Sequence, residues 1–334
     1  MTKWKKTGLL SLIFLIPFLL SLDSSAYNSN YYAKYISPEG ISLLSYTDTW
    51  DEEKLKQLYD ELIKNKHGEE IYHLQEIRVY GGHLQSAPLT RGQYHTLTST
   101  ITLYYGDVYT EPSTLKSTLS HEYGHHFTYH YLKEQHLPFS KWAKIRGLQT
   151  DSVRWDAFWN YTSGNHKWYP QEISADDYKL LYGATHQIDI DDVYSNEAFY
   201  VMTLHENQEL SNVFDNTVLH RYLEDLTGIP IETSRIIQTP QLSIANGEMI
   251  SFKVTEKANV AYRLTITYQD RDTELISITE NGQSELVYSI KELFEHGNSS
   301  LYTGYLEATI DVVDLSTSLG FKTKPFKFKL TELD

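Results

Sequence analysis

The sequence predicts a mixed α+β domain followed by an all-β domain, and three observations predict it. Up to about residue 237, helical stripes of apolar residues alternate with short strand-like runs. Beyond that point, nearly every segment is a short alternating run bounded by turn residues. At 334 residues, the chain also exceeds the usual size of one domain. We therefore predict domains over residues 27–237 and 240–334.

Residues 1–26 have the composition of a secretory signal peptide. A basic start is followed by an apolar run from Gly8 to Leu22, and Ser24-Ser25-Ala26 offers a cleavage site before Tyr27. The run is shorter than the 18 or more apolar residues of a membrane-spanning helix. We expect a secreted, extracellular protein rather than one that keeps an N-terminal membrane anchor.

Composition excludes several function classes. The chain has no cysteine, so disulfide frameworks and thiol chemistry are excluded. Its net charge of −15 disfavours nucleic acid and anionic membranes as partners. We expect an acidic, soluble monomer.

The first domain opens with a predicted helix and two predicted strands. Thr49 and Glu52 fit a capping box ahead of an apolar helical stripe that is ended by Gly68. A strand is predicted over residues 71–80. A second, half-buried strand is predicted over 97–103, where apolar residues alternate with threonines.

Most of the remaining elements of this domain are predicted to be helices. Pro112 and Ser113 open a helix that runs to about Lys133. Further helices are predicted over 140–146, 151–159, 171–182 and 212–227, the last one ending at Gly228.

The helix that begins at Pro112 carries His121-Glu122-Tyr123-Gly124-His125. Residues four apart are neighbours on a helix surface, so both imidazoles can converge on one zinc ion, which takes nitrogen ligands at about 2.0–2.1 Å. Glu122 is offset by one position, from which it can take a proton from a zinc-bound water as general base. The pattern is typical of a catalytic zinc site.

A second element downstream supplies a third ligand. Glu172 lies near the start of a predicted helix and offers a carboxylate, which leaves the fourth position open to water, as catalytic zinc sites require. Asp176, four residues later on the same face, is placed to accept the free ring N–H of a zinc-bound histidine, which we expect to be His121.

Together, the HExxH pattern and Glu172-x-x-Ala175-Asp176 resemble the gluzincin metallopeptidases, with the compact spacing of minigluzincin-like members. The resemblance covers mainly residues 95–183 and implies a zincin-like domain. It implies that the metal ligands are His121, His125 and Glu172, and that Glu122 is the general base. The chain lacks the His-x-x-Gly-x-x-His extension of the metzincins, which favours glutamate as third ligand.

The residue that stabilises the oxyanion is left open. Related enzymes place a tyrosine or histidine near the third ligand, and four residues qualify by position in the sequence: Tyr161, His166, Tyr169 and Tyr178. The predicted strand at 98–105, ahead of the motif helix, resembles the edge strand that lines a zinc peptidase cleft. An exposed edge there would bind an extended peptide by β-addition, whereas an internal strand would not.

Residues 240–334 contain roughly seven short alternating strands, the pattern of an Ig-like β-sandwich. Cysteine and tryptophan are absent from this region, so it is not an antibody-type domain. Fold does not determine function, so this domain can bind a cell-wall or surface ligand, bind substrate, or only cover the catalytic domain. The predicted runs cover residues 242–244, 249–254, 260–268, 275–279, 286–290, 302–312 and 325–330.

The acidic run at residues 189–192 and the histidines outside the site are not predicted to bind metal. Asp189, Asp191 and Asp192 lack the glycine and the terminal glutamate of an EF-hand loop, so we predict a solvated loop. His126 is rotated about 100° from His125 and should face the core or solvent. No ligand-like spacing involves the other histidines outside the site, His205 among them.

The sequence therefore predicts a secreted zinc metallopeptidase that hydrolyses internal bonds of a peptide or protein substrate. An alternative is a catalytically inactive zinc-binding or adhesive cell-surface protein. A third hypothesis is a hydrolase that cleaves another amide, such as cell-wall peptide.

Overall fold

The computed structural model describes residues 30–329 except 86, 88, 246–248, 269–270 and 291–304. The predicted signal peptide lies outside the described residues. Within the described part of the chain, none of the helices combines the length and the apolar character needed to cross a membrane. Over the described residues, the chain is a mixed α+β protein with three β-sheets.

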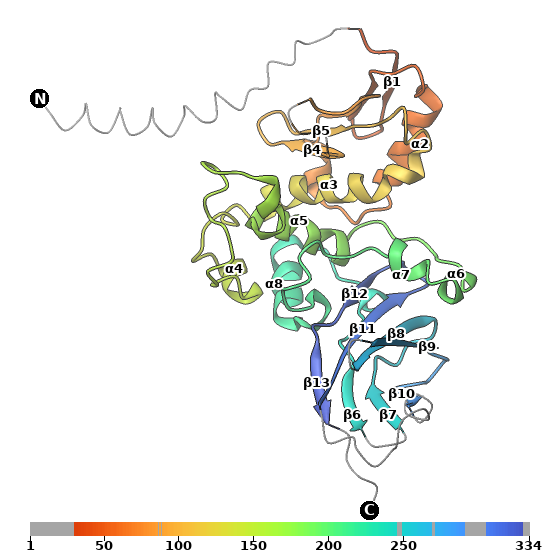
Figure 1. Ribbon diagram of the computed structural model, residues 1–334. Helices are drawn as coiled ribbons and strands as arrows, with labels where there is room; N and C mark the ends of the chain where they lie inside the picture. The colour runs from red at the N-terminus through yellow and green to blue at the C-terminus, as the bar shows by residue number, and fades with distance from the viewer. Residues whose placement is uncertain are drawn as a thin grey trace, which may run out of the picture.

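The first sheet has the strand order β1-β2-β3-β5-β4 (Figure 1). Strands β2, β3 and β5 are parallel, and β1 and β4 run antiparallel to their neighbours at the two edges. Leu43, Ile77 and Ile101 lie side by side across the three central strands and are fully buried. The strand bounds are β1 Ala33–Ile36, β2 Ser42–Ser45, β3 Glu76–Val79, β4 Gly92–His95 and β5 Thr100–Leu103.

The predicted edge strand is internal, which corrects the expectation for residues 98–105. Strand β5 is paired on one side with β3 and on the other with β4, so the edge is β4. All four residues of β5 are buried, while Leu97 is 59% exposed. The alternation of apolar and threonine residues predicted a half-buried strand, but both faces of β5 are covered.

Two other elements differ from what their local signals predict. Helix α2 (Glu52–Leu62) is capped by Asp51, whose side chain accepts a hydrogen bond from the Lys54 N–H at 2.9 Å, and not by Thr49. The Thr49 hydroxyl instead donates to Asp107. The strand predicted over residues 71–80 begins only at β3, since a 3₁₀ helix, η1 (Glu69–His73), precedes it.

Helix α3 (Lys116–Tyr131) carries the HEYGH motif and lies between the first sheet and helix α5 (Pro170–Leu181) (Figure 1). A 3₁₀ turn, η2 (Pro112–Leu115), leads into it, so the predicted start is confirmed. Small residues bring the two helices together. A Cβ at Gly124 would lie 2.7 Å from the carbonyl oxygen of Ala175, so only glycine permits this approach.

The remaining helices precede or follow α5 along the chain. Residues 151–159, predicted as a helix, form turns, and a 3₁₀ helix η3 follows them. Helix α8 ends at Gly228, which has φ +71°, as the sequence predicts. The bounds are α4 Lys141–Arg146, η3 Ser163–Trp168, α6 Asp191–Tyr194, α7 Ala198–Val201, η4 Val213–Asp215, α8 Thr217–Thr227 and η5 Thr233–Arg235.

The C-terminal strands form two antiparallel sheets with the orders β10-β7-β6 and β12-β11-β8-β9, and β13 pairs with β11. Each predicted run corresponds to a strand in its described part, and β12 is an addition. We call residues 241–329 the C-terminal β-unit. Its strands are β6 Gln241–Ala245, β7 Met249–Lys253, β8 Val260–Tyr268, β9 Arg271–Ile278, β10 Glu285–Ser289, β11 Tyr305–Asp314, β12 Gly320–Lys322 and β13 Phe326–Lys329.

The C-terminal β-unit is packed against the rest of the chain. One apolar core runs from Leu43 in the first sheet to Ile310 in β11, and the Phe214 and Phe321 rings lie 6.4 Å apart within it. A second cluster joins the segment of α6 and α7 to β8 and β11.

Candidate metal centre

Helices α3 and α5 bring His121, His125 and Glu172 together. The Oε2 atom of Glu172 lies 3.3 Å from Nε2 of His121 and 3.1 Å from Nε2 of His125. The ligand atoms of all three residues lie within 4.8 Å of one another. Among the described residues, this is the only cluster of three such side chains with that geometry.

These residues fit a metal ion. Ligands at about 2.0–2.1 Å from a tetrahedral ion lie roughly 3.3 Å from one another, close to the two nitrogen–oxygen distances above. His125 and Glu172 are buried, and the His121 side chain is 16% exposed. Two imidazoles and one carboxylate therefore converge on a single point, with His121 the most exposed of the three.

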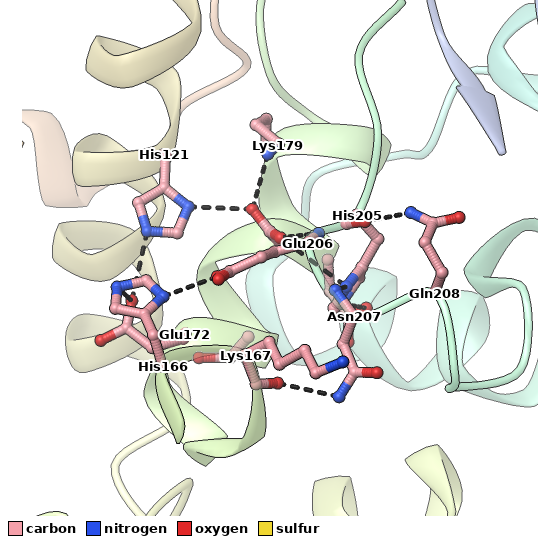
Figure 2. A network of polar contacts seen from close by, with 12 residues as sticks. His121, His166, Lys167, Glu172, Lys179, His205, Glu206, Asn207 and Gln208 are labelled. Atoms are coloured by element: carbon pink, nitrogen blue, oxygen red, sulfur yellow. Dashed lines mark hydrogen bonds and ion pairs between the residues drawn. The ribbon is translucent and has the colours of Figure 1, made fainter. Parts of the chain in front are cut away.

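Asp176 fixes the orientation of His121. Its Oδ1 atom lies 2.9 Å from Nδ1 of His121, so the ring donates Nδ1–H and turns Nε2 towards Glu172 (Figure 2). Asp176 also pairs with Lys179 at 2.6 Å and accepts the main-chain N–H of Glu206. Burial alone would raise the pKa of the Asp176 carboxyl, but Lys179 and His121 hold it well below its usual range.

The charges of the cluster are strongly coupled. Burial would lower the pKa of the His121 imidazole, but hydrogen bonds to Asp176 and Glu172 raise it to about 10. Burial would raise the pKa of Glu172, yet His125 and His121 keep it well below the ordinary value. Glu172 is thus an anion, as a ligand must be.

Glu122 lies between this cluster and the edge strand β4. A Cβ at Gly92, the first residue of β4, would lie 2.5 Å from the Glu122 carboxylate, so the strand backbone passes directly beside it. Burial raises the pKa of the Glu122 carboxyl, with His121 and His125 opposing the shift. A carboxyl with a raised pKa can both accept and return a proton near neutral pH.

The structure shows which of the four candidate oxyanion-stabilising residues lie beside the cluster. The Tyr161 hydroxyl donates to Oε1 of Glu172 at 3.3 Å, and Nε2 of His166 lies 3.3 Å from Oε2 of Glu172. The Tyr169 ring instead stacks on Tyr161 at 4.7 Å, and its hydroxyl donates to the carbonyl of Asn160. The Tyr178 hydroxyl, in the core, donates to the carbonyl of Lys66. Only Tyr161 and His166 reach the cluster.

Comparisons with known proteins add little to this geometry. No known protein family and no curated protein matches the chain. Among the solved structures that are similar to it, three illustrate the likeness. They are OgpA from Akkermansia muciniphila (10% identity, TM-score 0.21, covering 84% of this chain and 70% of that one), the ZmpB metallopeptidase from Clostridium perfringens (12%, 0.21, 83% and 63%), and the CBM32-1, CBM32-2 and M60 catalytic domains of ZmpB (10%, 0.20, 82% and 33%). At such TM-scores the likeness carries no argument, so the functional argument depends on the site.

Sequence reasoning missed two residues beside the cluster. Oε2 of Glu206 lies 2.6 Å from Nδ1 of His166, and Nδ1 of His205 lies 3.6 Å from Oδ2 of Asp176 (Figure 2). Their backbone is neither helix nor strand and lies about thirty residues beyond Asp176. No local pattern marks them, because the contacts arise only when the chain folds back over α5. His126, expected in the core or solvent, is in the core, with Nε2–H donating to the carbonyl of Glu70 at 2.7 Å.

Proposed function

We propose that this chain is a secreted zinc metallopeptidase of the gluzincin type that hydrolyses internal peptide bonds. The observation that carries the proposal is the convergence of two imidazoles and a carboxylate with Glu122 beside them. His121, His125 and Glu172 are the proposed zinc ligands and Asp176 orients His121. Nitrogen and carboxylate donors without cysteine favour zinc in a catalytic site.

Bound zinc would polarise the scissile carbonyl and lower the pKa of a bound water. Glu122 takes the proton of the attacking water and passes it to the leaving amine, which its raised pKa suits. Tyr161 and His166 stand on the Glu172 side of the cluster, where their O–H and N–H can donate to the developing oxyanion. Burial would lower the pKa of the His166 imidazole, but Glu206, which accepts its Nδ1–H, raises it together with Glu172, so the protonated ring also carries an Nε2–H that can donate.

Strand β4 is the proposed support for the substrate. It lies at the sheet edge and begins beside Glu122, so an extended peptide that pairs with it passes the general base. Gly92 has no side chain between the strand and Glu122. We also propose that the signal peptide is cleaved and that the protein is a monomer. Residues 27–237 are proposed to have a zincin-like arrangement, and the C-terminal β-unit an Ig-like one.

The test replaces Glu122 with glutamine. Glu122→Gln should lower the turnover of unfolded casein by about 10²–10⁴-fold, the typical contribution of a general base, with one zinc still bound per chain. Glu134→Gln, an exposed change in the turn that follows α3, is the matched control and should keep full activity. Unchanged hydrolysis in Glu122→Gln would refute the mechanism.

Two further outcomes separate the other functions. Stoichiometric zinc in wild type without cleavage of casein or a panel of unfolded proteins would favour an inactive zinc-binding or adhesive protein. Cleavage of purified cell-wall fragments without cleavage of casein would favour a hydrolase for cell-wall peptide.

A further inference from the structure

The segment from His186 to Gln208, here called the strap, joins the C-terminal β-unit to the metal centre. It leaves α5, runs along the second C-terminal sheet through α6 and α7, and returns to the cluster at His205 and Glu206 (Figure 1). Local signals in the sequence gave this segment no role, and the proposed mechanism uses only the Glu206 carboxylate at its end.

The strap is fixed to the C-terminal β-unit at both ends. Near its start, the Ile188 N–H donates to the carbonyl of Leu315 at 2.8 Å. Near its end, the Thr203 N–H donates to the carbonyl of Ser318 at 2.7 Å, and the Gly320 N–H donates to the carbonyl of Thr203 at 3.0 Å. These bonds join the strap to the turn between β11 and β12.

Apolar and cationic contacts hold the middle of the strap. Val193, Phe199 and Met202 pack against Ala261 and Val313 of the sheet. The guanidinium of Arg263, which is paired with Asp311 at 2.7 Å, lies 4.7 Å from the centre of the Phe199 ring. Helices α6 and α7 have four residues each, far fewer than the about 12–15 that an isolated helix needs in water. Their conformation therefore depends on the sheet.

The end of the strap contacts the groups that orient the site. The Glu206 N–H donates to Oδ2 of Asp176, the residue that holds His121. The Glu206 carboxylate holds His166. Gln208 connects the two sides directly. Its Nε2 donates to the carbonyl of His205 (Figure 2). Its Oε1 accepts the N–H of Lys322 in β12 at 3.3 Å.

We propose that the C-terminal β-unit is a positioning part of the metal centre: through the strap, it holds Glu206 against Asp176 and His166. The inference deepens the proposed function. Its prediction for zinc affinity requires only that the metal centre binds zinc, and not that the protein hydrolyses peptides.

Two substitutions in the full chain weaken the strap without touching the cluster. Gln208→Ala removes the bridge between Lys322 and His205. Gly320→Ala places a Cβ 2.5 Å from the carbonyl oxygen of Val312 and 2.6 Å from Sδ of Met202, which displaces the strap from β12. Leu286→Ala is the control. Leu286 is buried in β10, in the sheet β10-β7-β6, so its substitution destabilises the β-unit in the sheet that does not hold the strap.

The readouts are the zinc dissociation constant, from competition with a chromophoric chelator, and kcat and KM on unfolded casein, below the unfolding transition. Gln208→Ala and Gly320→Ala should each weaken zinc binding by about tenfold, the low end for changes to groups that orient metal ligands. Both should lower kcat by about tenfold with KM within about twofold. Glu206→Ala should lower kcat similarly, and Glu206→Gln, which keeps an oxygen acceptor for His166, should recover most of it.

Leu286→Ala should lower the unfolding temperature and keep wild-type zinc affinity and kcat. Wild-type values in both Gln208→Ala and Gly320→Ala would overturn the proposal. If Gly320→Ala does not fold, Gln208→Ala decides alone. If wild type binds zinc and cleaves nothing, the proposed function fails, while the zinc dissociation constants still test the strap.

Discussion

Gly124 controls the distance between the two helices that supply the metal ligands. An added Cβ would lie 2.7 Å from the carbonyl oxygen of Ala175 and 3.0 Å from its Cα. Favourable contacts between heavy atoms begin at about 3.5 Å, so α3 and α5 must separate by about 0.8 Å to admit one methyl group. Because the obstacle is backbone, no side-chain rotation relieves it. We expect Gly124→Ala to cost about 1–3 kcal/mol of unfolding free energy, the usual cost of overpacking.

The same displacement should damage zinc binding. Helix α3 carries His121 and His125, while α5 carries Glu172 and Asp176, so separation of the helices divides the ligand set. A metal constellation must be held within about 0.5 Å of its productive geometry. We therefore expect Gly124→Ala to weaken zinc binding by about 10–100-fold, as loss of an orienting contact does.

Urea denaturation of the metal-free protein gives the first quantity, and competition with a chelator gives the second. Gly82→Ala is the matched control, because a Cβ at Gly82 meets no atom within 4 Å and Gly82 does not have a left-handed backbone. It should leave both quantities at wild-type values. The reasoning is refuted if Gly124→Ala unfolds within about 0.5 kcal/mol of wild type, the usual range of a surface change, and binds zinc with unchanged affinity.

Two further predictions concern the edge strand and the metal. Gly92→Ala places a Cβ 2.5 Å from Oε1 of Glu122, so it should lower kcat/KM on casein by about tenfold or more, as loss of a well-placed base does, while zinc content stays at one per chain. Wild-type kcat/KM would mean that β4 does not approach the base in the active enzyme. Zinc at a thousand times its dissociation constant should stabilise the chain by about 4 kcal/mol, seen as a higher unfolding temperature that a chelator reverses. Glu172→Ala should lose most of this gain, and an equal gain in that variant would exclude Glu172 as a ligand.

The residues of the cluster could be found from the sequence because each pair lies within one helix. The separation of His121 from His125, and of Glu172 from Asp176, is four residues, and helix geometry fixes such pairs on one face. Gly124 and Ala175 are the small residues that let the two faces meet. The spacing thus predicted which side chains share a helix face, whereas the meeting of the two faces was implied by the resemblance to the gluzincins.

The sequence-based predictions were wrong where a tertiary contact decides between two conformations that the local sequence allows equally. Thr49 and Asp51 are both good helix caps, and Asp51 caps α2 while Asp107 engages Thr49. The alternation near residue 100 is typical of a half-buried strand, but β4 covers the open side of β5. Four-residue strands such as β4 are too short for a clear period.

Two neighbouring carboxylates on α5 explain why the site needs chain far outside its motifs. Asp176 and Asp177 are both buried, and a buried anion is costly unless it is paired and hydrogen-bonded. Asp177 receives the guanidinium of Arg146 from α4 at 3.0 Å, and Asp176 receives Lys179, His121 and the main chain of the strap. The motif residues therefore supply the metal ligands, but the groups that keep the orienting carboxylate charged and fixed come partly from a segment that folds only against the C-terminal β-unit. A chain cut after α8 would keep all the ligands and lose that support.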